Sequence, residues 1–289
     1  MRNATALFRW AAPMIAVGIL VGGCGQLPIN RTADGGVPPA GGLHGQAVPA
    51  RGGAPGMPMA AGPAGSGKLP QPAAPETMPA GTVIRNPANG RKEVVVQDIA
   101  RTAVLIGDSQ SEPDDSWPRR ALAGLGYDVH FCGRGGTGFV ASNGTTGNYI
   151  DALQRGDWLL PYGAPPLVVI AGGGNDASRG ATDQQITANA ERLIASVRQR
   201  YPGARLAMVG TLARGAANGG GRRTEVDALL GTVAARHAIA FVGVGDWLTR
   251  YNLTGFLADG VHMGPGGHAA LGSLLGRRLD ELGFRSPGA

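Results

Sequence analysis

Residues 102–282 alternate between short apolar runs and helical patterns, and this alternation constrains the fold more than any other feature of the sequence. Short apolar runs rich in β-branched residues predict buried strands. Strands that alternate with helices form parallel sheets with helices on both faces. The sequence therefore predicts a three-layer α/β/α fold with a five-stranded parallel sheet. We expect its strands at 102–106, 127–131, 166–171, 205–209 and 239–244.

The segments between these strands predict helices. The clearest start is at Thr182, whose spacing to Gln185 is that of a capping box. The last helix has leucines on one face and Gly283 as its stop. We expect helices over 116–125, 148–154, from 182 onward, over 224–237 and over 266–282.

Polar groups with catalytic potential follow four of the predicted strands. Ligands bind beyond the carboxyl ends of the strands in open parallel sheets, so these loops are expected to meet at one edge. The first, second and third strands are followed by Ser109, by a glycine-rich loop at 133–138 and by Asn175. Asp259 and His262 lie between the fifth strand and the last helix.

This set matches what the hydrolysis of an ester requires, namely a nucleophile, a base, a carboxylate that orients the base, and donors for the developing oxyanion. Ser109 provides a hydroxyl and His262 a base. Asp259 stands three residues before His262, near enough to bond its imidazole within one turn. The Asn175 amide and backbone N–H groups of the glycine loop provide donors.

These blocks resemble the SGNH (GDSL-type) hydrolases, a flavodoxin-like superfamily of esterases, lipases and carbohydrate deacetylases. The resemblance spans about residues 101–283 and rests on Gly107-Asp108-Ser109, Gly136, Gly173-x-Asn175-Asp176 and Asp259-x-x-His262. It implies that Ser109 is the nucleophile, His262 the base and Asp259 its orienting carboxylate.

The resemblance also implies an oxyanion hole and the absence of a cofactor. Its donors would be the N–H groups of Ser109 and Gly136 and the amide of Asn175, with Gly135 and Gly138 as rivals of Gly136. Family members need neither a metal ion nor an organic cofactor, so none is expected. Gln110 stands where the family name has Leu, which we expect to affect substrate preference more than activity.

The segment before this domain is predicted to export and tether it. Residues 1–24 have a basic start and an apolar core that ends in Val-Gly-Gly-Cys, which resembles the lipobox of bacterial lipoproteins. By that resemblance Cys24 is lipidated and anchors the chain to the membrane; plain signal cleavage with secretion, and an uncleaved anchor, are the alternatives. Residues 25–90 are expected to be a disordered tether, because 35 of the 57 residues at 25–81 are Gly, Pro or Ala.

Two nucleotide-binding motifs and nucleic-acid binding are disfavoured. The dinucleotide fingerprint is matched by Gly133-x-Gly135-x-x-Gly138, but this motif follows the second predicted strand, whereas the fingerprint should follow the first. The segment 62–69 resembles a P-loop but lacks the Ser or Thr that a P-loop needs to hold Mg²⁺. The net charge of +6 comes mostly from the N-terminal segment, because residues 91–289 carry 20 Lys/Arg and 18 Asp/Glu. That domain shows no basic stripe with interleaved aromatic residues. Cys132 is expected to be a buried free thiol.

The sequence thus predicts an exported, membrane-anchored or secreted serine esterase of the cell envelope, acting on carbohydrate or lipid esters through an acyl-enzyme on Ser109. An acyltransferase that uses the same site, and a non-catalytic envelope-binding lipoprotein, are the alternatives. Candidates for the substrate pocket are Trp117, Arg134, Trp158 and Trp247, each of which has a structural role as its alternative. The sequence leaves the acyl chain, the alcohol and the oligomeric state open.

Overall fold

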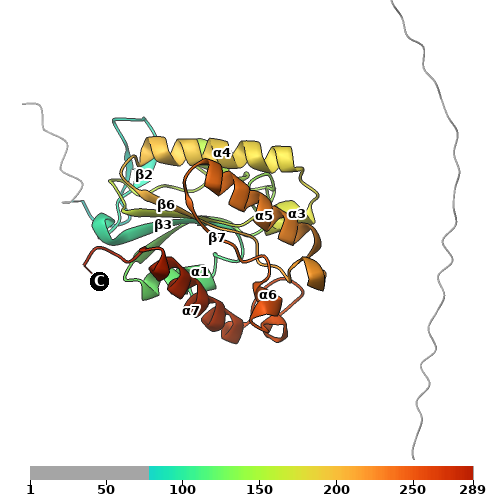
Figure 1. Ribbon diagram of the computed structural model, residues 1–289. Coiled ribbons are helices and arrows are strands. Elements are labelled where there is room, and N and C mark those ends of the chain that lie inside the picture. The colour runs from blue at the N-terminus through green and yellow to red at the C-terminus, as the bar shows by residue number, and fades with distance from the viewer. Residues whose placement is uncertain (1–77, 289) are drawn as a thin grey trace, which may run out of the picture. The chain divides into compact units, whose positions relative to one another are not determined.

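The computed structural model describes residues 78–288 (Figure 1). A parallel sheet of five strands forms its centre, as predicted, in the order β4-β3-β5-β6-β7. The first strand of the chain in this sheet therefore lies between the second and the third. The strands are β3 (Thr102–Gly107), β4 (Asp128–Gly133), β5 (Leu167–Ala171), β6 (Arg205–Val209) and β7 (Ala240–Val242).

Helices cover both faces of the sheet (Figure 1). One face carries α2 (Tyr149–Arg155), α3 (Gly174–Ser178), α4 (Asp183–Arg200) and α5 (Gly221–Arg236). The other carries α1 (Trp117–Gly124), α6 (Trp247–Arg250) and α7 (Pro265–Glu281). Each face has its own hydrophobic core, because side chains alternate along a strand: Val104 and Ile106 of β3 face one set of helices, Ala103 and Leu105 the other.

The predicted helices are present within a few residues of their expected ends. The capping box of α4 is formed, with the Thr182 hydroxyl and the Gln185 amide each accepting from the other's backbone N–H. Two short helices, α3 and α6, were not predicted. With five and four residues, they are too short to show a helical repeat in the sequence.

The folded region begins earlier than expected. A hairpin of β1 (Val83–Arg85) and β2 (Lys92–Val94) precedes the sheet, so residues 83–90 belong to the fold and not to the tether. The buried carboxylate of Glu93 attaches the hairpin to α4 through an ion pair with Arg200. The leader at 1–24, Cys24 and the tether up to residue 77 lie outside the described residues.

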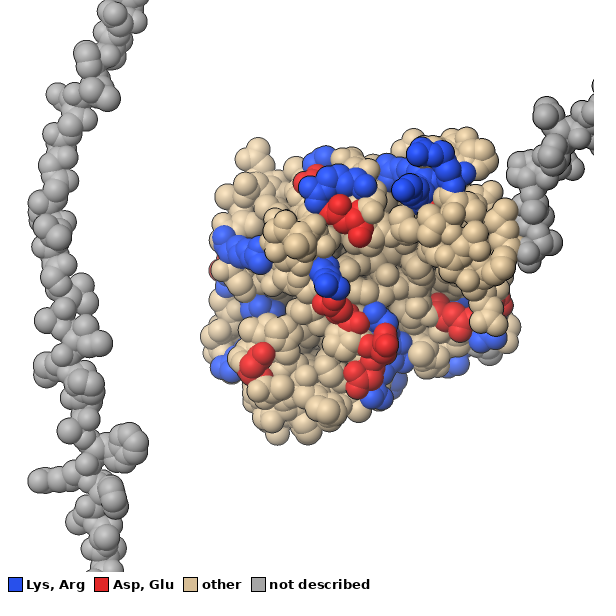
Figure 2. All heavy atoms as spheres, turned by 180° about the vertical axis from the view of Figure 1, so that it is seen from behind, with Lys and Arg blue, Asp and Glu red and all other residues tan. Residues whose placement is uncertain are grey.

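The charged side chains of the described residues are mixed in sign. Figure 2 shows Lys and Arg side chains beside Asp and Glu side chains on a face that consists mostly of uncharged residues. This agrees with the near balance of charge in the domain. Within residues 78–288, no helix is both long and apolar enough to cross a membrane.

Candidate active site

The structure brings the predicted catalytic side chains together at the carboxyl edge of the sheet. Ser109 follows β3, Gly136 follows β4 and Asn175 lies in α3 directly after β5. Asp259 and His262 belong to the segment before α7. Four stretches of chain far apart in the sequence therefore meet at one place, because parallel strands all end at the same edge.

Ser109, His262 and Asp259 form a continuous hydrogen-bonded chain. Nε2 of His262 lies 2.9 Å from Oγ of Ser109, and Nδ1 of His262 lies 2.8 Å from Oδ2 of Asp259. Nδ1 donates to the carboxylate when it carries the imidazole proton, which leaves Nε2 free to accept the proton of the serine hydroxyl. This is the arrangement of a serine nucleophile with its base and the group that orients the base.

The Asp259 carboxylate also fixes the backbone of its own turn. Its Oδ1 accepts hydrogen bonds from the backbone N–H groups of Val261 (2.7 Å) and His262 (2.6 Å). These bonds and the bond to the imidazole stabilise the charged form, so the pKa of Asp259 lies well below that of an ordinary carboxyl. The side chain thus stays anionic at any pH at which the imidazole can act as a base.

The hydrogen bonds of the glycine loop after β4 distinguish Gly136 from Gly135 and Gly138, the two alternative oxyanion donors. The N–H of Gly135 donates to Oε2 of Glu112 (2.7 Å), and the N–H of Gly138 donates to the carbonyl of Ala141 (2.9 Å). Within residues 78–288, the N–H groups of Gly136 and Ser109 have no hydrogen-bond acceptor. Gly136 has φ of +78°, a conformation that favours glycine. The two predicted backbone donors are therefore the ones left without a partner.

Asn175, the third predicted donor, is held in place by the glycine loop. Its Nδ2 donates to the carbonyl of Thr137 (2.9 Å) and lies 3.4 Å from Oδ2 of Asp108. A primary amide carries two N–H groups, and these two contacts use both of them, so a substrate oxygen would compete with the longer contact, the one to Asp108. The position beside the loop that carries Gly136 agrees with the predicted role.

Asp176 stabilises the segment 139–141 that follows the glycine loop, a role that the sequence did not reveal. Its side chain is fully buried and accepts hydrogen bonds from the backbone N–H groups of Phe139 (2.9 Å), Val140 (2.7 Å) and Ala141 (2.8 Å). Three backbone donors offset the cost of burying the carboxylate. The only sequence signal was its place in the Gly-x-Asn-Asp block.

Asp108 is a second buried carboxyl group next to the nucleophile. It accepts a hydrogen bond from the backbone N–H of Gln110 (2.9 Å), and burial raises its pKa to about 6. The Arg223 guanidinium acts in the opposite direction and favours the anion. Asp108 therefore shapes the turn that presents Ser109.

Gln110 joins the nucleophile turn to the histidine segment, which the sequence did not predict. Its Nε2 donates to the carbonyl of Val261 (3.0 Å), next to His262. Its Oε1 accepts from Nε1 of Trp117 in α1 (3.2 Å). The residue at this position therefore contacts both halves of the candidate site.

The residues suggested for a substrate pocket have different locations. Trp117 and Trp247 are buried in the core, at 2% and 3% exposure, so their structural role is the one observed. Arg134 is exposed at the rim of the glycine loop and pairs with Glu112 at 3.3 Å. Trp158 lines a separate cavity. His268 accepts from the N–H of Trp117 at Nδ1 (3.2 Å), which is a structural contact.

Cys132 is a buried free thiol, as expected, and burial raises its pKa. The described part of the chain contains no group of three or more His, Cys, Asp or Glu side chains placed to hold a metal ion. The candidate site is thus built from a serine, a histidine, an aspartate and backbone or amide donors.

Comparison with known proteins yields a family and a fold. The model of the GDSL-like lipase/acylhydrolase family matches residues 102–270, which is more than half of the chain. The lipase/acylhydrolase from Enterococcus faecalis is similar in structure, with a TM-score of 0.50 and 22% identity over 65% of this chain and 100% of that one. A family two carbohydrate esterase from Cellvibrio japonicus has a TM-score of 0.50 and 16% identity over 67% of this chain and 64% of that one. No match was found among curated proteins.

Proposed function

This chain belongs to the GDSL-like lipase/acylhydrolase family and is a serine ester hydrolase of the SGNH type, and from that premise we propose that it cleaves short acyl esters through an acyl-enzyme on Ser109. The observation that carries the proposal is the hydrogen-bonded chain from Ser109 Oγ through the His262 imidazole to the Asp259 carboxylate.

In the first half-reaction, Oγ of Ser109 attacks the ester carbonyl carbon while Nε2 of His262 accepts the hydroxyl proton. The carbonyl oxygen becomes an oxyanion, which the N–H groups of Ser109 and Gly136 and the Asn175 amide stabilise. Asp259 stabilises the imidazolium that forms. His262 then donates its proton to the departing alkoxide oxygen, and the alcohol leaves the acyl-serine behind.

In the second half-reaction, water takes the place of the alcohol. His262 accepts a proton from the water as its oxygen attacks the acyl carbonyl. The second tetrahedral intermediate collapses when His262 returns the proton to Oγ of Ser109. The carboxylic acid leaves and the free enzyme is restored, so the cycle consumes only the ester and one water molecule.

The openness of the site supports a substrate in which the ester is attached to a larger alcohol. The side chains of His262 and Asp259 are 44% and 59% exposed, so the base lies at the surface and not in a deep tunnel. A surface site accepts an ester carried on a bulky molecule. We propose short acyl or O-acetyl groups on carbohydrate or glycolipid of the cell envelope as the substrate class.

The leader supports a location in that envelope. We propose that Cys24 carries the lipid that anchors the chain, and that the segment after it is a flexible tether. By random-coil scaling, a tether of this length has a typical reach of about 45 Å. A Cys24→Ser variant is expected to lose lipid labelling and to leave the membrane fraction; labelled, membrane-bound variant protein would contradict this proposal.

Activity on p-nitrophenyl esters tests the reaction. A Ser109→Ala variant is expected to lose turnover, and a variant as active as the wild type would refute the role of Ser109. A series of acyl lengths, and of acetylated sugars against acetylated simple alcohols, then defines the substrate. Repeating the assay with a free sugar acceptor separates hydrolysis, which releases the acid, from transfer, which yields a new sugar ester.

A further inference from the structure

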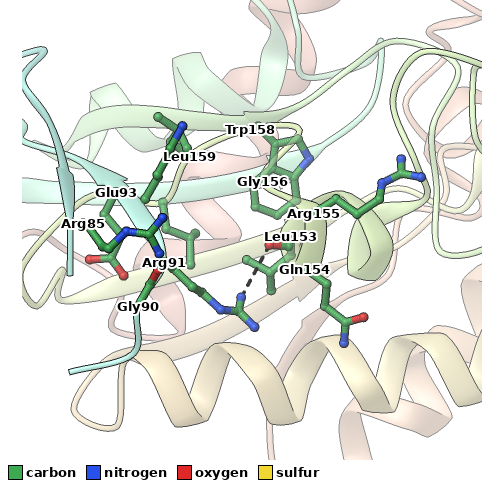
Figure 3. Close-up of a pocket in the computed structure, with 12 residues that line it drawn as sticks. Arg85, Gly90, Arg91, Glu93, Leu153, Gln154, Arg155, Gly156, Trp158 and Leu159 are labelled. Carbon is green, nitrogen blue, oxygen red and sulfur yellow. Dashed lines mark hydrogen bonds between the residues drawn. The ribbon is translucent and has the colours of Figure 1, made fainter. Parts of the chain in front are cut away.

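A cavity of about 350 Å³ lies away from the candidate active site, between the β1–β2 hairpin and the end of α2 (Figure 3). The hydroxyl of Tyr149, the first residue of α2, donates to the carbonyl of Ala171 at the carboxyl end of β5 (3.0 Å). Past the other end of α2, the carbonyl of Leu160 accepts from the N–H of Val94 (3.0 Å). Glu93 of the cavity lining pairs with Arg200, the last residue of α4, which leads into the amino end of β6. The cavity therefore lies toward the edge of the sheet opposite the catalytic groups.

The lining of this cavity is strongly cationic. Four basic side chains contribute to it: Arg85, Arg91, Lys92 and Arg155. Arg155 pairs with Asp157. Among the described residues the other three have no carboxylate within ion-pair distance. Three unneutralised cations around one cavity produce a positive potential that favours an anionic ligand.

The one carboxylate in the lining, Glu93, is fully engaged elsewhere. It is 1% exposed and accepts from Nη2 of Arg200 (2.6 Å). It also accepts from the side-chain amides of Asn86 (2.8 Å) and Asn89 (3.0 Å). Glu93 thus belongs to the attachment of the hairpin and is not available to neutralise the three basic side chains of the cavity.

The remaining lining groups favour a sugar over a simple anion. Leu153 at the end of α2 presents its carbonyl, 3.5 Å from Nη1 of Arg91, and Gly90 presents the carbonyl that Arg85 contacts at 2.6 Å. The half-buried indole of Trp158 adds an apolar ring (Figure 3). A bare phosphate or carboxylate ion uses only the cations. Sugar hydroxyls also donate to carbonyl oxygens, and the C–H face of a sugar ring packs on an aromatic ring.

We propose that this cavity binds an anionic saccharide, that is, a sugar unit that carries a carboxylate or a phosphate. Binding there does not depend on the chemistry of Ser109. The bound saccharide would be a distant segment of the same polymer whose esters are cleaved at the catalytic edge. This second step rests on the proposed function. The chain's own N-terminal segment is a poor occupant, because residues 1–77 carry five basic and two acidic residues.

Calorimetric titration of the full chain with tri-galacturonic acid, glucose 6-phosphate and neutral maltotriose tests the proposal. The acidic trisaccharide or the sugar phosphate, or both, should bind, and maltotriose should bind at least about tenfold more weakly. Affinity should fall as salt rises, because the cations are exposed. Arg91→Glu and Lys92→Glu should each weaken binding of the anion by about tenfold or more.

Arg277→Glu is the matched control, because Arg277 is exposed on α7, on the other face of the sheet. It should leave binding unchanged, and all three variants should retain wild-type turnover of a p-nitrophenyl ester. Equal binding of acidic and neutral sugars, no binding of either anion, or unchanged affinity in Arg91→Glu would overturn the proposal. Binding of anionic phospholipid vesicles without binding of either sugar anion would also overturn it and assign the cavity to a membrane surface. Loss of esterase activity in Ser109→Ala, with anion binding retained, separates this site from the catalytic one.

Discussion

Asp259 acts on His262 through both the side chain and the backbone. One carboxylate oxygen contacts Nδ1 of the imidazole and the other accepts two N–H groups of the turn. The first contact selects the tautomer in which Nε2 accepts the serine proton. The second fixes where the imidazole is placed. Removing the negative charge while keeping the shape therefore isolates the electrostatic role of this residue.

Asp259→Asn is expected to lower kcat for p-nitrophenyl acetate by about 10²–10⁴-fold. An asparagine amide can donate to Nδ1, which moves the imidazole proton to Nε2 and blocks proton transfer from Ser109. KM should change little, since Asp259 lies behind the imidazole. Asp246→Asn, at another exposed aspartate, is the control. A kcat within threefold of the wild type would contradict this role of Asp259.

Gln110→Leu, which restores the residue of the family name, is expected to lower kcat about fivefold. It removes the bond to the Val261 carbonyl, and a neutral hydrogen bond contributes about 1 kcal/mol. Gln110→Glu keeps the acceptor for Trp117 but loses the donor to Val261. If the bond to Val261 positions His262, both variants should have a lower kcat and an unchanged KM. A change in KM alone would instead assign Gln110 to substrate binding.

The positions of some single residues could be predicted from the sequence, and those of others could not. The roles of Ser109, Asp259 and His262 were predictable because their short sequence blocks resemble those of a known family and follow in the same order along the chain. Gln110 was predicted to affect substrate preference, whereas its side chain bonds the histidine segment 151 positions away. That contact depends on how the loops pack, which no local pattern encodes.

At the scale of elements, Asp227 links α5 to the ends of two strands. Its Oδ1 accepts from the backbone N–H of Val244 (3.0 Å), and burial raises its pKa to about 6. A carboxyl whose pKa is raised by folding binds more protons in the folded state than in the unfolded one. Its contribution to stability is therefore present below about pH 4 and is lost as the pH rises to about 6.

Asp227→Asn is expected to remove this pH dependence. The stability of the variant minus that of the wild type should rise between about pH 4 and 6 and then level off. Any cost of the altered hydrogen bonds is independent of pH and shifts the whole difference without changing its slope. Urea unfolding at a series of pH values measures it. A difference that stays flat across this range would show that Asp227 titrates normally.

The long elements were predictable and the short ones were not. The five strands and the larger helices have apolar periodicity, and the α4 capping box identified its start to within a residue. By contrast, α3 spans five residues within what reads as a glycine-rich turn. It is held by its position after β5 and by the bonds of Asp176 to the loop at 139–141. Such tertiary contacts override local propensity.

At the scale of the whole domain, one buried ion pair joins the β1–β2 hairpin to α4. Composition placed the boundary of the tether near residue 90, because Gly and Pro are dense up to residue 81 and the hairpin strands have only three residues each. The hairpin is held against α4 by Glu93 and Arg200, whose side chains are 1% and 13% exposed. The sequence separates these partners by 107 positions.

Glu93→Gln is expected to destabilise the domain by about 3 kcal/mol, because it leaves the Arg200 guanidinium buried without its counter-charge. Glu191→Gln, at a half-exposed pair with Arg236, should cost less than about 1 kcal/mol. Chemical denaturation compares the two. Equal costs would show that the hairpin is not held by this pair. Esterase activity of the folded Glu93→Gln protein should be unchanged, since the catalytic edge is opposite.

The account rests on Ser109 as the nucleophile, and covalent labelling tests this most directly. A fluorophosphonate ester reacts with a serine hydroxyl that has an activating base beside it and remains attached. Peptide mapping of the labelled wild-type chain should find one adduct, on Ser109, with esterase activity lost in proportion to labelling. Ser109→Ala should take up no label. Complete labelling at another residue, or full esterase activity in a chain whose Ser109 carries the adduct, would contradict the account.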